Sequence, residues 1–357
     1  MFYAMLLAGG SGTRFWPESR IVRPKQLLRI IGERTMIQAT ADRVAPLIPF
    51  ERMMVVCGFA HKEEIRFQLG SIPQRMIVVE PQGLNTAPCI ALGTYKLANQ
   101  DPEAVITVLP ADHTIGKEAE FLSLMDIAHR VAMEGEWLIT FGILPMSPET
   151  GYGYIQYSDV AKTVDSQPLF RVKRFVEKPD LQKATEYIAQ GNYLWNSGMF
   201  VWQAKTIIRA FETYLPRLAH AMEKVVPHFD TPREAQAVLD AYETISSVSI
   251  DYGIMEKASN VLVMPADVEW NDVGAWNSLE KIWEKDQDGN AFRGHLISLQ
   301  SGSCIVSSMK KLTALIGVED LIVVDTADAL LVCRKDRAQE VKNLQELLKI
   351  QGYQELL

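Results

Sequence analysis

Short apolar runs separated by amphipathic segments constrain the fold of this chain more than any other feature. Such runs occur at Tyr3–Leu7, Met53–Cys57, Met76–Val79, Val105–Leu109 and Trp137–Gly142. Helical patterns lie between them, at Ile37–Leu47, His61–Leu69, Ala87–Asn99 and Glu118–Met133. Strands that are apolar on both faces and alternate with helices are typical of a parallel sheet covered on both sides. The pattern therefore predicts an α/β fold, with ligands bound beyond the carboxyl ends of the strands.

The pattern changes after about Tyr152. Two antiparallel strands are predicted at Tyr154–Tyr157 and Phe170–Val176, with a polar turn near Asp159–Gln167. Helices are then predicted at Leu181–Gln190, Lys205–Val225 and Pro232–Tyr242.

The segment after Trp283, EKDQDGN, is charged and rich in turn residues, which predicts a linker. Short strands and one helix are predicted beyond it, at Gly294–Leu299, Ser303–Ser307, Leu312–Ile316, Leu321–Asp325, Ala329–Arg334 and Arg337–Ile350. We therefore predict a catalytic domain at residues 1–286 and a small β-rich C-terminal domain at residues 287–357.

Composition excludes several classes of protein. Apolar residues make up 48% of the chain and charged residues 22%, so a sizeable core is expected. The formal net charge of -8 opposes a nucleic-acid binder that works through a general basic surface. The cysteines and histidines show no zinc spacing, and no apolar run is long enough to cross a membrane. The N-terminal run indicates a buried strand and no signal peptide, so we expect a cytoplasmic protein without a membrane or nucleic-acid partner.

A glycine-rich loop, LLAGGSGTRFWPESRIVRPKQLL, follows the first predicted strand directly. Gly9, Gly10 and Gly12 allow backbone conformations closed to other residues, and the N–H groups of such a turn can bind phosphate. Arg14 can add a planar fork to phosphate oxygens, and Lys25 a compact charge. The alternative is a turn that only packs tightly; the two cations at this spacing favour phosphate binding.

The loop matches neither GxxxxGK[ST] nor GxGxxG followed by an acid, which disfavours P-loop proteins and dehydrogenases. It resembles the signature of sugar-phosphate nucleotidyltransferases, GGxGTRLxPxTxxxPK. Its Trp16-Pro17, Ser19-Arg20 and Pro24-Lys25-Gln26 resemble mannose-1-phosphate guanylyltransferases more than thymidylyl- or uridylyltransferases. The resemblance implies a Rossmann-like mixed, mainly parallel sheet flanked by helices, of the nucleotide-diphospho-sugar transferase type, with a small C-terminal β-rich domain.

The same resemblance extends to Glu80–Ile90, EPQGLNTAPCI, which looks like the guanine and ribose segment of the family. Asn85 and Thr86 would also cap a helix that starts near Ala87, and both roles are compatible. The residues implied in nucleotide binding are Leu7, Ala8, Gly9, Gly10, Gly12, Thr13, Arg14, Lys25, Asn85, Thr86, Pro88 and Asp112.

Two aspartates are candidate magnesium ligands. Asp112 lies in LPADH at the end of the fourth predicted strand, and Asp272 lies in WNDVG. A carboxylate at a strand end suits Mg²⁺, which takes hard oxygen ligands and keeps several waters. A lone Asp there is more often a helix cap, but the pair matches the family arrangement. We therefore expect Mg²⁺ as the cofactor.

The family resemblance also implies a sugar-phosphate site. In FVEKP, Glu177 is expected to bind sugar hydroxyls and Lys178 the sugar phosphate. Because adjacent strand residues point to opposite faces, at most one of them should face the ligand squarely. Asn196 in NSGMF, Gly153 in GYGY and Asp272 complete the implied set.

A further segment, SIDYGIMEK, also resembles the family. Ile250, Tyr252 and Ile254 are expected to be structural, and the role of Asp251 stays open.

The resemblance implies the transfer of GMP from GTP to mannose 1-phosphate, with Arg14, Lys25 and Lys178 as catalytic residues. Because the attacking phosphate is already an anion, no general base is needed, and Lys25→Ala should reduce turnover with little loss of fold. The alternatives are another sugar phosphate or base, such as glucose 1-phosphate with dTTP or UTP, and a non-catalytic sugar-nucleotide-sensing subunit. The tail lacks clustered His and Glu, so isomerase activity is not expected. The β-rich tail should pack on the catalytic domain or form the contact of a homodimer.

Overall fold

The computed structural model describes residues 1–10 and 12–357, so Ser11 of the predicted loop lies outside the described residues. The chain forms two compact units, each made of several segments. Unit 1 comprises Met1–Gly9, Thr40–Ala111 and Ile115–Trp270. Unit 2 comprises Gly10–Ala39, Asp112–Thr114 and Asn271–Leu357. The predicted division after residue 286 stays a prediction.

Unit 1 is built on a nine-stranded sheet with the order β3-β2-β1-β4-β8-β5-β9-β7-β6. The strands are β1 (Phe2–Ala8), β2 (Met53–Gly58), β3 (Ile77–Glu80), β4 (Val105–Pro110), β5 (Leu138–Ile143), β6 (Tyr154–Val164), β7 (Gln167–Val176), β8 (Tyr193–Gln203) and β9 (Val261–Ala266). Strands β1 to β4 pair in parallel, whereas β8 is antiparallel to both β4 and β5. The predicted mixed, Rossmann-like sheet is confirmed.

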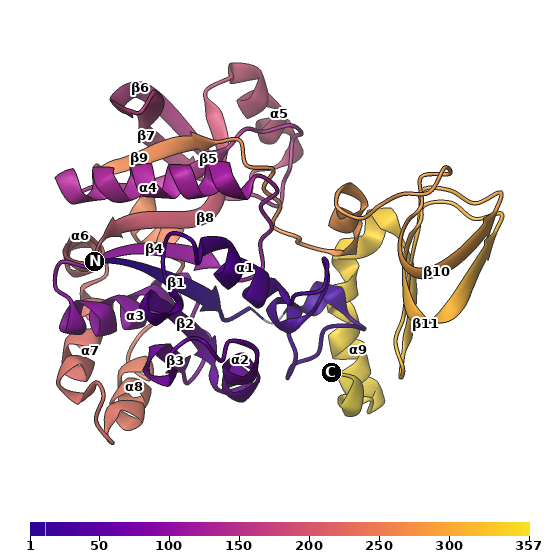
Figure 1. Cartoon of the computed structure of the whole chain (residues 1–357), viewed down its shortest axis with the longest axis horizontal. Coiled ribbons are helices and arrows are strands. Elements are labelled where there is room, and N and C mark those ends of the chain that lie inside the picture. Colours follow the sequence, from indigo (N-terminus) through magenta and orange to yellow (C-terminus); the bar gives the residue numbers. More distant parts are fainter. Residues whose placement is uncertain (11) are drawn as a thin grey trace. The chain divides into compact units, whose positions relative to one another are not determined.

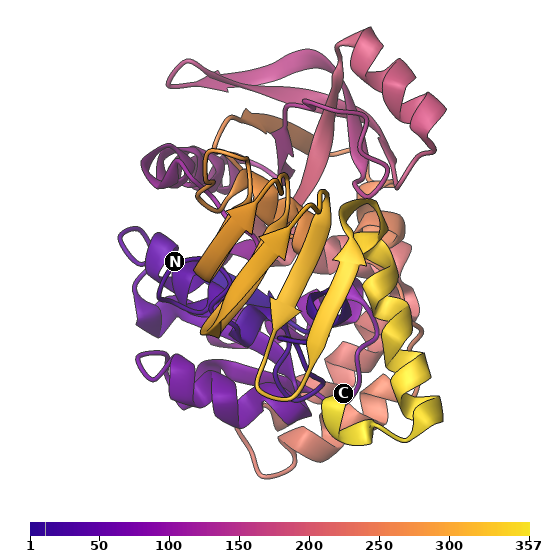
Figure 2. The same ribbon diagram turned by 90° about the vertical axis from the view of Figure 1, so that its right-hand side faces the viewer.

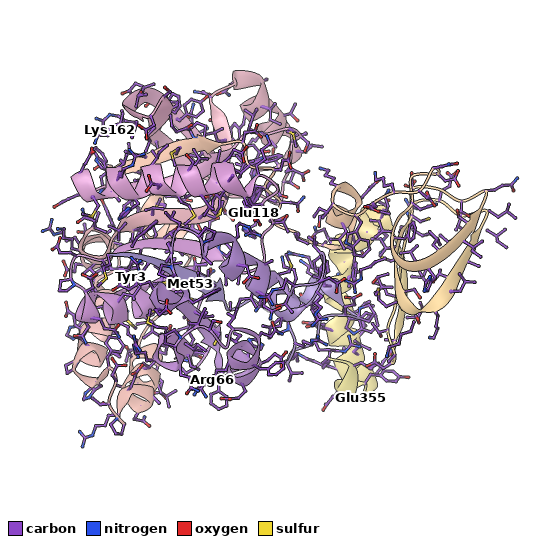
Figure 3. The ribbon with its side chains drawn as sticks, viewed as in Figure 1. Tyr3, Met53, Arg66, Glu118, Lys162 and Glu355 are labelled. Carbon is purple, nitrogen blue, oxygen red and sulfur yellow. The ribbon has the colours of Figure 1, made fainter. Side chains whose placement is uncertain are left out.

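The centre of this sheet is covered by helices. Side chains of neighbouring strands, such as Tyr3 on β1 and Met53 on β2, are buried (Figure 3). Helix α4 (Glu118–Glu134) lies along one face of the sheet (Figure 1), and α3 (Thr86–Gln100) packs on β1 and β2. The other α-helices that contribute residues to unit 1 are α1 (Met36–Val44), α2 (Lys62–Gln68), α5 (Leu181–Gln190), α6 (Ala204–Tyr214), α7 (Pro216–Val225) and α8 (Glu234–Tyr242).

The predicted strands of the first 143 residues are confirmed, but two later predictions need correction and two strands were missed. The predicted turn at Asp159–Gln167 is mostly strand, because Asp165 and Ser166 take positive φ and close a two-residue hairpin between β6 and β7. The predicted helix Lys205–Val225 is two helices, since Pro216 has no N–H and begins α7. Strands β8 and β9 were not predicted.

Unit 2 contains a four-stranded sheet of β10 (Ala291–Leu299), β11 (Ile305–Ile316), β12 (Leu321–Asp325) and β13 (Leu330–Arg334). Figure 2 shows these strands side by side. The first three pair in parallel, and β13 is antiparallel to β12.

Two predictions for the C-terminal part are corrected in their detail. The predicted strands Ser303–Ser307 and Leu312–Ile316 are one strand, β11, whose register against β10 shifts next to Gly294. Gly294 has φ 105°, and a Cβ there would lie 1.8 Å from the Ser308 carbonyl oxygen, so only glycine fits. The predicted final helix is a 3-10 segment, η9 (Lys335–Asn343), followed by α9 (Leu344–Gln351).

The hydrophobic core of unit 2 joins the N-terminal loop to the C-terminal strands. The Trp16 indole N–H donates to the Leu356 carbonyl at 2.9 Å, and the Trp276 N–H donates to the Trp16 carbonyl at 3.0 Å. The buried members of this core are Phe15, Trp16, Leu28, Ile30, Met36, Val273, Ala275, Trp276, Leu279, Ala291, Ile305, Ile322, Val324, Leu331, Ala338 and Val341. The C-terminal strands therefore pack on residues of the loop, as one of the two predicted roles of the tail requires.

The predicted linker is a hydrogen-bonded turn. Asn290 is fully buried, and its side chain donates to Asp286 Oδ2 at 2.9 Å and accepts from the Cys304 N–H. No helix in the described part of the chain is both long and apolar enough to cross a bilayer.

Candidate active site

The glycine loop of unit 2 closes tightly around Lys25. Gly12 has φ 58°, and a Cβ there would lie 2.6 Å from both the backbone N and the Cβ of Lys25. The Ser19 hydroxyl donates to the Gly12 carbonyl at 2.8 Å, and the Gln26 side chain donates to the Gly10 carbonyl at 2.9 Å. Glycine is thus required at position 12 by both its conformation and its neighbour.

The side chain of Lys25 connects three segments of the predicted site. Lys25 is 5% exposed, and its Nζ lies 2.7 Å from Asp112 Oδ2. The same ammonium donates to the carbonyl oxygens of Asp272 and Val273, at 2.8 and 2.9 Å. An ammonium has three N–H donors, and these three acceptors match that number. The structure therefore brings Lys25, Asp112 and Asp272 together, with Lys25 in a positioning role.

The turn at Asp272 directs these carbonyls to Lys25 by an unusual backbone conformation. Val273 is fully buried and has φ 48°, a left-handed conformation that is costly for a β-branched residue. It is held there by the Asn271 side chain, which accepts from the Val273 N–H at 2.7 Å. Asp272 Oδ1 accepts from the Gly274 N–H at 3.1 Å. The WNDVG motif is therefore a strained turn that Asn271 and Lys25 stabilise from two sides.

Asp112 is an ionised carboxylate in this environment. Burial by itself raises the pKa of Asp112, but the Lys25 ammonium, His113 and two hydrogen bonds lower it, and the net pKa lies below the ordinary value. The Asp112 side chain is still 31% exposed. It can therefore offer an oxygen to a cation at neutral pH.

The carboxylates of Asp112 and Asp272 suit magnesium only if oxygen atoms of a bound phosphate complete its ligands. Within residues 1–10 and 12–357, no group of three or more His, Cys, Asp or Glu side chains gathers as a metal cage. Mg²⁺ commonly uses one or two carboxylates, and waters and substrate phosphate oxygens complete its octahedron. Asp112 and Asp272 supply the carboxylates that such a site needs, and Lys25 contacts the carboxylate of the first and the backbone carbonyl of the second.

The loop residues Gly9, Gly10 and Arg14 are exposed to solvent, whereas Phe15 is buried. Arg14 is exposed in η1 (Thr13–Phe15), while the next residue, Phe15, is buried in the core of unit 2. The Arg14 side chain is therefore accessible to a ligand. Gly9 and Gly10, which follow Leu7 and Ala8 at the end of β1, are exposed.

The segment predicted to bind guanine and ribose forms the start of α3 in unit 1. Asn85 is exposed with φ 71°, and its side-chain oxygen accepts from the Thr86 N–H at 2.8 Å. Thr86 Oγ1 accepts from the Ile250 N–H at 2.8 Å, and Pro88 is buried in the first turn. The capping role of Asn85 is thus confirmed, and Thr86 ties α3 to the SIDYGIMEK segment.

The predicted sugar-binding residues of unit 1 also lie together. A Cβ at Gly153 would lie 2.7 Å from Glu177 Oε2 and 3.4 Å from Asn196 Cβ. That at most one of Glu177 and Lys178 faces the ligand squarely stays a prediction, but its reason changes, because β7 ends at Val176 and Lys178 has φ 43°. Strand alternation does not apply there, and the two side chains form an ion pair.

The sequence analysis left Asp251 open, and the structure places it in this group. The Asn196 side-chain amide donates to Asp251 Oδ1 at 2.7 Å, and its oxygen accepts from the Gly198 N–H at 3.1 Å. The Asn196 amide is therefore oriented from both ends. Burial raises the pKa of Asp251 to about 6, the bond from Asn196 opposes that rise, and the charge of Glu177 adds to it.

The structural roles predicted beside Asp251 are confirmed in part. Ile250 and Ile254 are buried, but Tyr252 is 52% exposed. The reason is local, because Asp251–Met255 forms a π-helical turn, η7, whose side-chain spacing differs from that of a strand or an α-helix.

An aromatic cluster near the predicted sugar residues escaped the sequence analysis. The Tyr152 ring packs edge-on against Trp195 and Trp270, with centroids 5.1 and 5.2 Å apart. Trp195 precedes Asn196 directly. No local pattern could reveal this cluster, because its members come from distant parts of the chain.

The raised pKa of Asp251 predicts a pH-dependent gain in stability for Asp251→Asn. Because the folded-state pKa of this carboxyl is raised, its ionisation destabilises the fold, with no cost below the ordinary pKa of 3.8 and the full cost above about 6. The amide can still accept from Asn196, so we expect a gain of about 1 to 3 kcal/mol at pH 8 that vanishes as the pH falls to about 4. Thermal unfolding at pH 4, 6 and 8 measures it. Exposed Asp240→Asn is the control, and an equal gain at all pH values would contradict the prediction.

Two family models and several known proteins match this chain. The family model for nucleotidyl transferase matches residues 3–289, and a model for a MannoseP isomerase/GMP-like beta-helix domain matches residues 294–348. A mannose-1-phosphate guanylyltransferase of Klebsiella pneumoniae is 39% identical over 352 residues, which cover 98% of this chain and 74% of that protein. The alginate biosynthesis protein AlgA of Pseudomonas aeruginosa is 37% identical over 98% of this chain and 73% of its own length.

A solved structure is similar over nearly the whole chain. It is a crystal structure from Thermus thermophilus, described as a mannose-1-phosphate geranyltransferase. The two chains are 33% identical with a TM-score of 0.88, over 98% of this chain and 99% of the other. Together with the match to the family model, this similarity shows that the chain belongs to the nucleotidyl transferase family and that it is an enzyme of that family.

Proposed function

We propose that this enzyme transfers GMP from GTP to α-D-mannose 1-phosphate, releasing pyrophosphate. The observation that carries the proposal is the ammonium of Lys25, which links the glycine loop to Asp112 and to the Asp272 turn. Phosphate-binding glycines and two candidate metal ligands thus depend on one side chain. The choice of guanine and mannose is supported by relatives that are named mannose-1-phosphate guanylyltransferases.

The reaction needs positioning more than proton transfer. A phosphate oxygen of mannose 1-phosphate attacks the α-phosphorus of GTP in line, and the bond to the pyrophosphate oxygen breaks. The nucleophile is an anion, so the main obstacle is repulsion between two polyanions. The amides of the glycine loop and Arg14 hold the triphosphate, and Lys178 meets the sugar phosphate.

The sugar hydroxyls are recognised by the group in unit 1. Glu177 accepts hydrogen bonds from them, and Asn196, oriented by Asp251, both donates and accepts. Gly153 leaves the space beside Glu177 and Asn196 that a side chain would fill. Asp112 and Asp272 would hold Mg²⁺, which would supply positive charge to the phosphates. The homodimer and the cytoplasmic location stay predictions.

A substrate panel tests the proposal. Pyrophosphate release is measured with GTP, dTTP, UTP and ATP, each against mannose 1-phosphate and glucose 1-phosphate. We expect GTP with mannose 1-phosphate to give the highest kcat/KM, by at least about tenfold, because buried polar groups that fit one base are left unpaired by another. A preference for dTTP or UTP with glucose 1-phosphate would replace the proposed substrates. Binding of GDP-mannose without turnover of any pair would indicate a sensing subunit.

A further inference from the structure

A cavity of about 620 Å³ in unit 2 is lined by six cationic side chains. They are Arg20, Arg23, Arg29, Arg293, Lys310 and Lys311. The cavity lies where residues 17–29 meet residues 309–311 and 325–328. Its volume falls in the range that small-molecule sites usually have.

The acidic side chains in this cavity are already engaged. Asp328 pairs with Arg20 at 2.9 Å, and Asp325 pairs with Lys311 at 3.0 Å. This leaves a local excess of positive charge in a chain whose net charge is -8.

The third acid, Glu18, accepts from the Ser307 hydroxyl at 2.6 Å and lies 3.6 Å from Arg293. Arg293 Nε is buried without a hydrogen-bond partner among the described residues, a state that costs free energy until an acceptor arrives.

Three cations remain for a ligand. Arg23, Arg29 and Lys310 are exposed and make no ion pair within the part of the chain that the structure describes. Guanidinium groups are suited to phosphate oxygens because their N–H donors form a planar fork. The positive charges of these three side chains are complementary to the negative charges of a chain of phosphates.

The cavity is separate from the candidate active site. Its lining includes neither Arg14 nor Lys25, nor Asp112 or Asp272. Even so, the lining residues between Pro17 and Arg29 belong to the loop that carries Lys25. Both sites therefore share one backbone segment.

We propose that this cavity is a second, non-catalytic anion site that binds a polyphosphate group, such as the phosphate chain of a nucleotide. A ligand there contacts both the loop and strands β11 and β12, and it tightens the segment that positions Lys25. The proposal does not depend on which base or sugar the enzyme uses.

Isothermal titration of the full-length protein with inorganic tripolyphosphate tests this site. The variant Arg29→Gln/Lys310→Gln removes two of its charges, and neither residue belongs to the candidate active site. The matched control, Lys342→Gln/Lys349→Gln, removes two charges from unit 2 outside the cavity lining.

We expect the wild type and the control to bind one equivalent more than the cavity variant, or to bind that equivalent at least about tenfold more tightly. Turnover without added tripolyphosphate should be the same in all three proteins. Equal binding of tripolyphosphate by the cavity variant and the control would overturn the proposal. Any loss of binding relative to the wild type would then reflect the change in net charge alone.

Discussion

Replacing Lys25 by alanine is expected to remove most turnover and to lower the melting temperature as well. The sequence analysis predicted little loss of fold, but the structure changes that expectation. Lys25 is buried, and its removal leaves Asp112 and the carbonyls of Asp272 and Val273 without their donor. Breaking a fully buried ion pair costs about 3 to 5 kcal/mol, and we expect a smaller loss here because the Asp112 side chain is 31% exposed. We expect kcat/KM to fall by about 10³, a loss typical of removing one preorganised electrostatic contact.

Lys96→Ala is a matched control for this variant. Lys96 is also buried, in unit 1, where it pairs with Glu234 at 2.6 Å and Asp230 at 3.2 Å. Both variants should unfold at lower temperature, but only Lys25→Ala should lose kcat/KM when both are assayed well below their melting temperatures. If Lys25→Ala kept the melting temperature of the wild type, the positioning role of Lys25 would be wrong.

Much of the fold could be predicted because each of the first five strands is a separate apolar run. Strand β8, YLWNSGMFVWQ, was missed because its polar centre was interpreted only as a ligand motif. Strand β9, VLVMPA, contains Pro265, which argues against a central strand. These two strands depend on pairing with distant partners, which the local sequence does not reveal.

The candidate site could be predicted as residue types but not as contacts. The glycines, Lys25 and the two aspartates each follow from a motif. Lys25 can donate to the carbonyls at the Asp272 turn because Val273 has a positive φ. No residue propensity predicts that conformation. The bond between Asn196 and Asp251 likewise joins residues 55 positions apart.

Asp112→Asn is expected to be the second most damaging substitution. Asparagine keeps the size of the side chain but removes the charge that faces Lys25 and, as proposed, Mg²⁺. Turnover should fall by about 10², and half-maximal activity should need more Mg²⁺. Pyrophosphate release measured over a range of Mg²⁺ concentrations tests both effects.

The same variant makes a stability prediction whose sign follows from the pKa. Burial raises the pKa of Asp112, but the Lys25 and His113 charges and two hydrogen bonds together outweigh it, so the pKa is lowered in the fold and the ionised form stabilises the protein above the ordinary value of 3.8. Asp112→Asn should therefore be less stable than the wild type at pH 7, and the difference should shrink as the pH falls below about 4. Asp267→Asn is the control, because Asp267 forms an exposed pair with Lys117 at 2.8 Å and exposed pairs contribute little. Near-normal turnover of Asp112→Asn at the wild-type Mg²⁺ optimum would exclude Asp112 as a metal ligand.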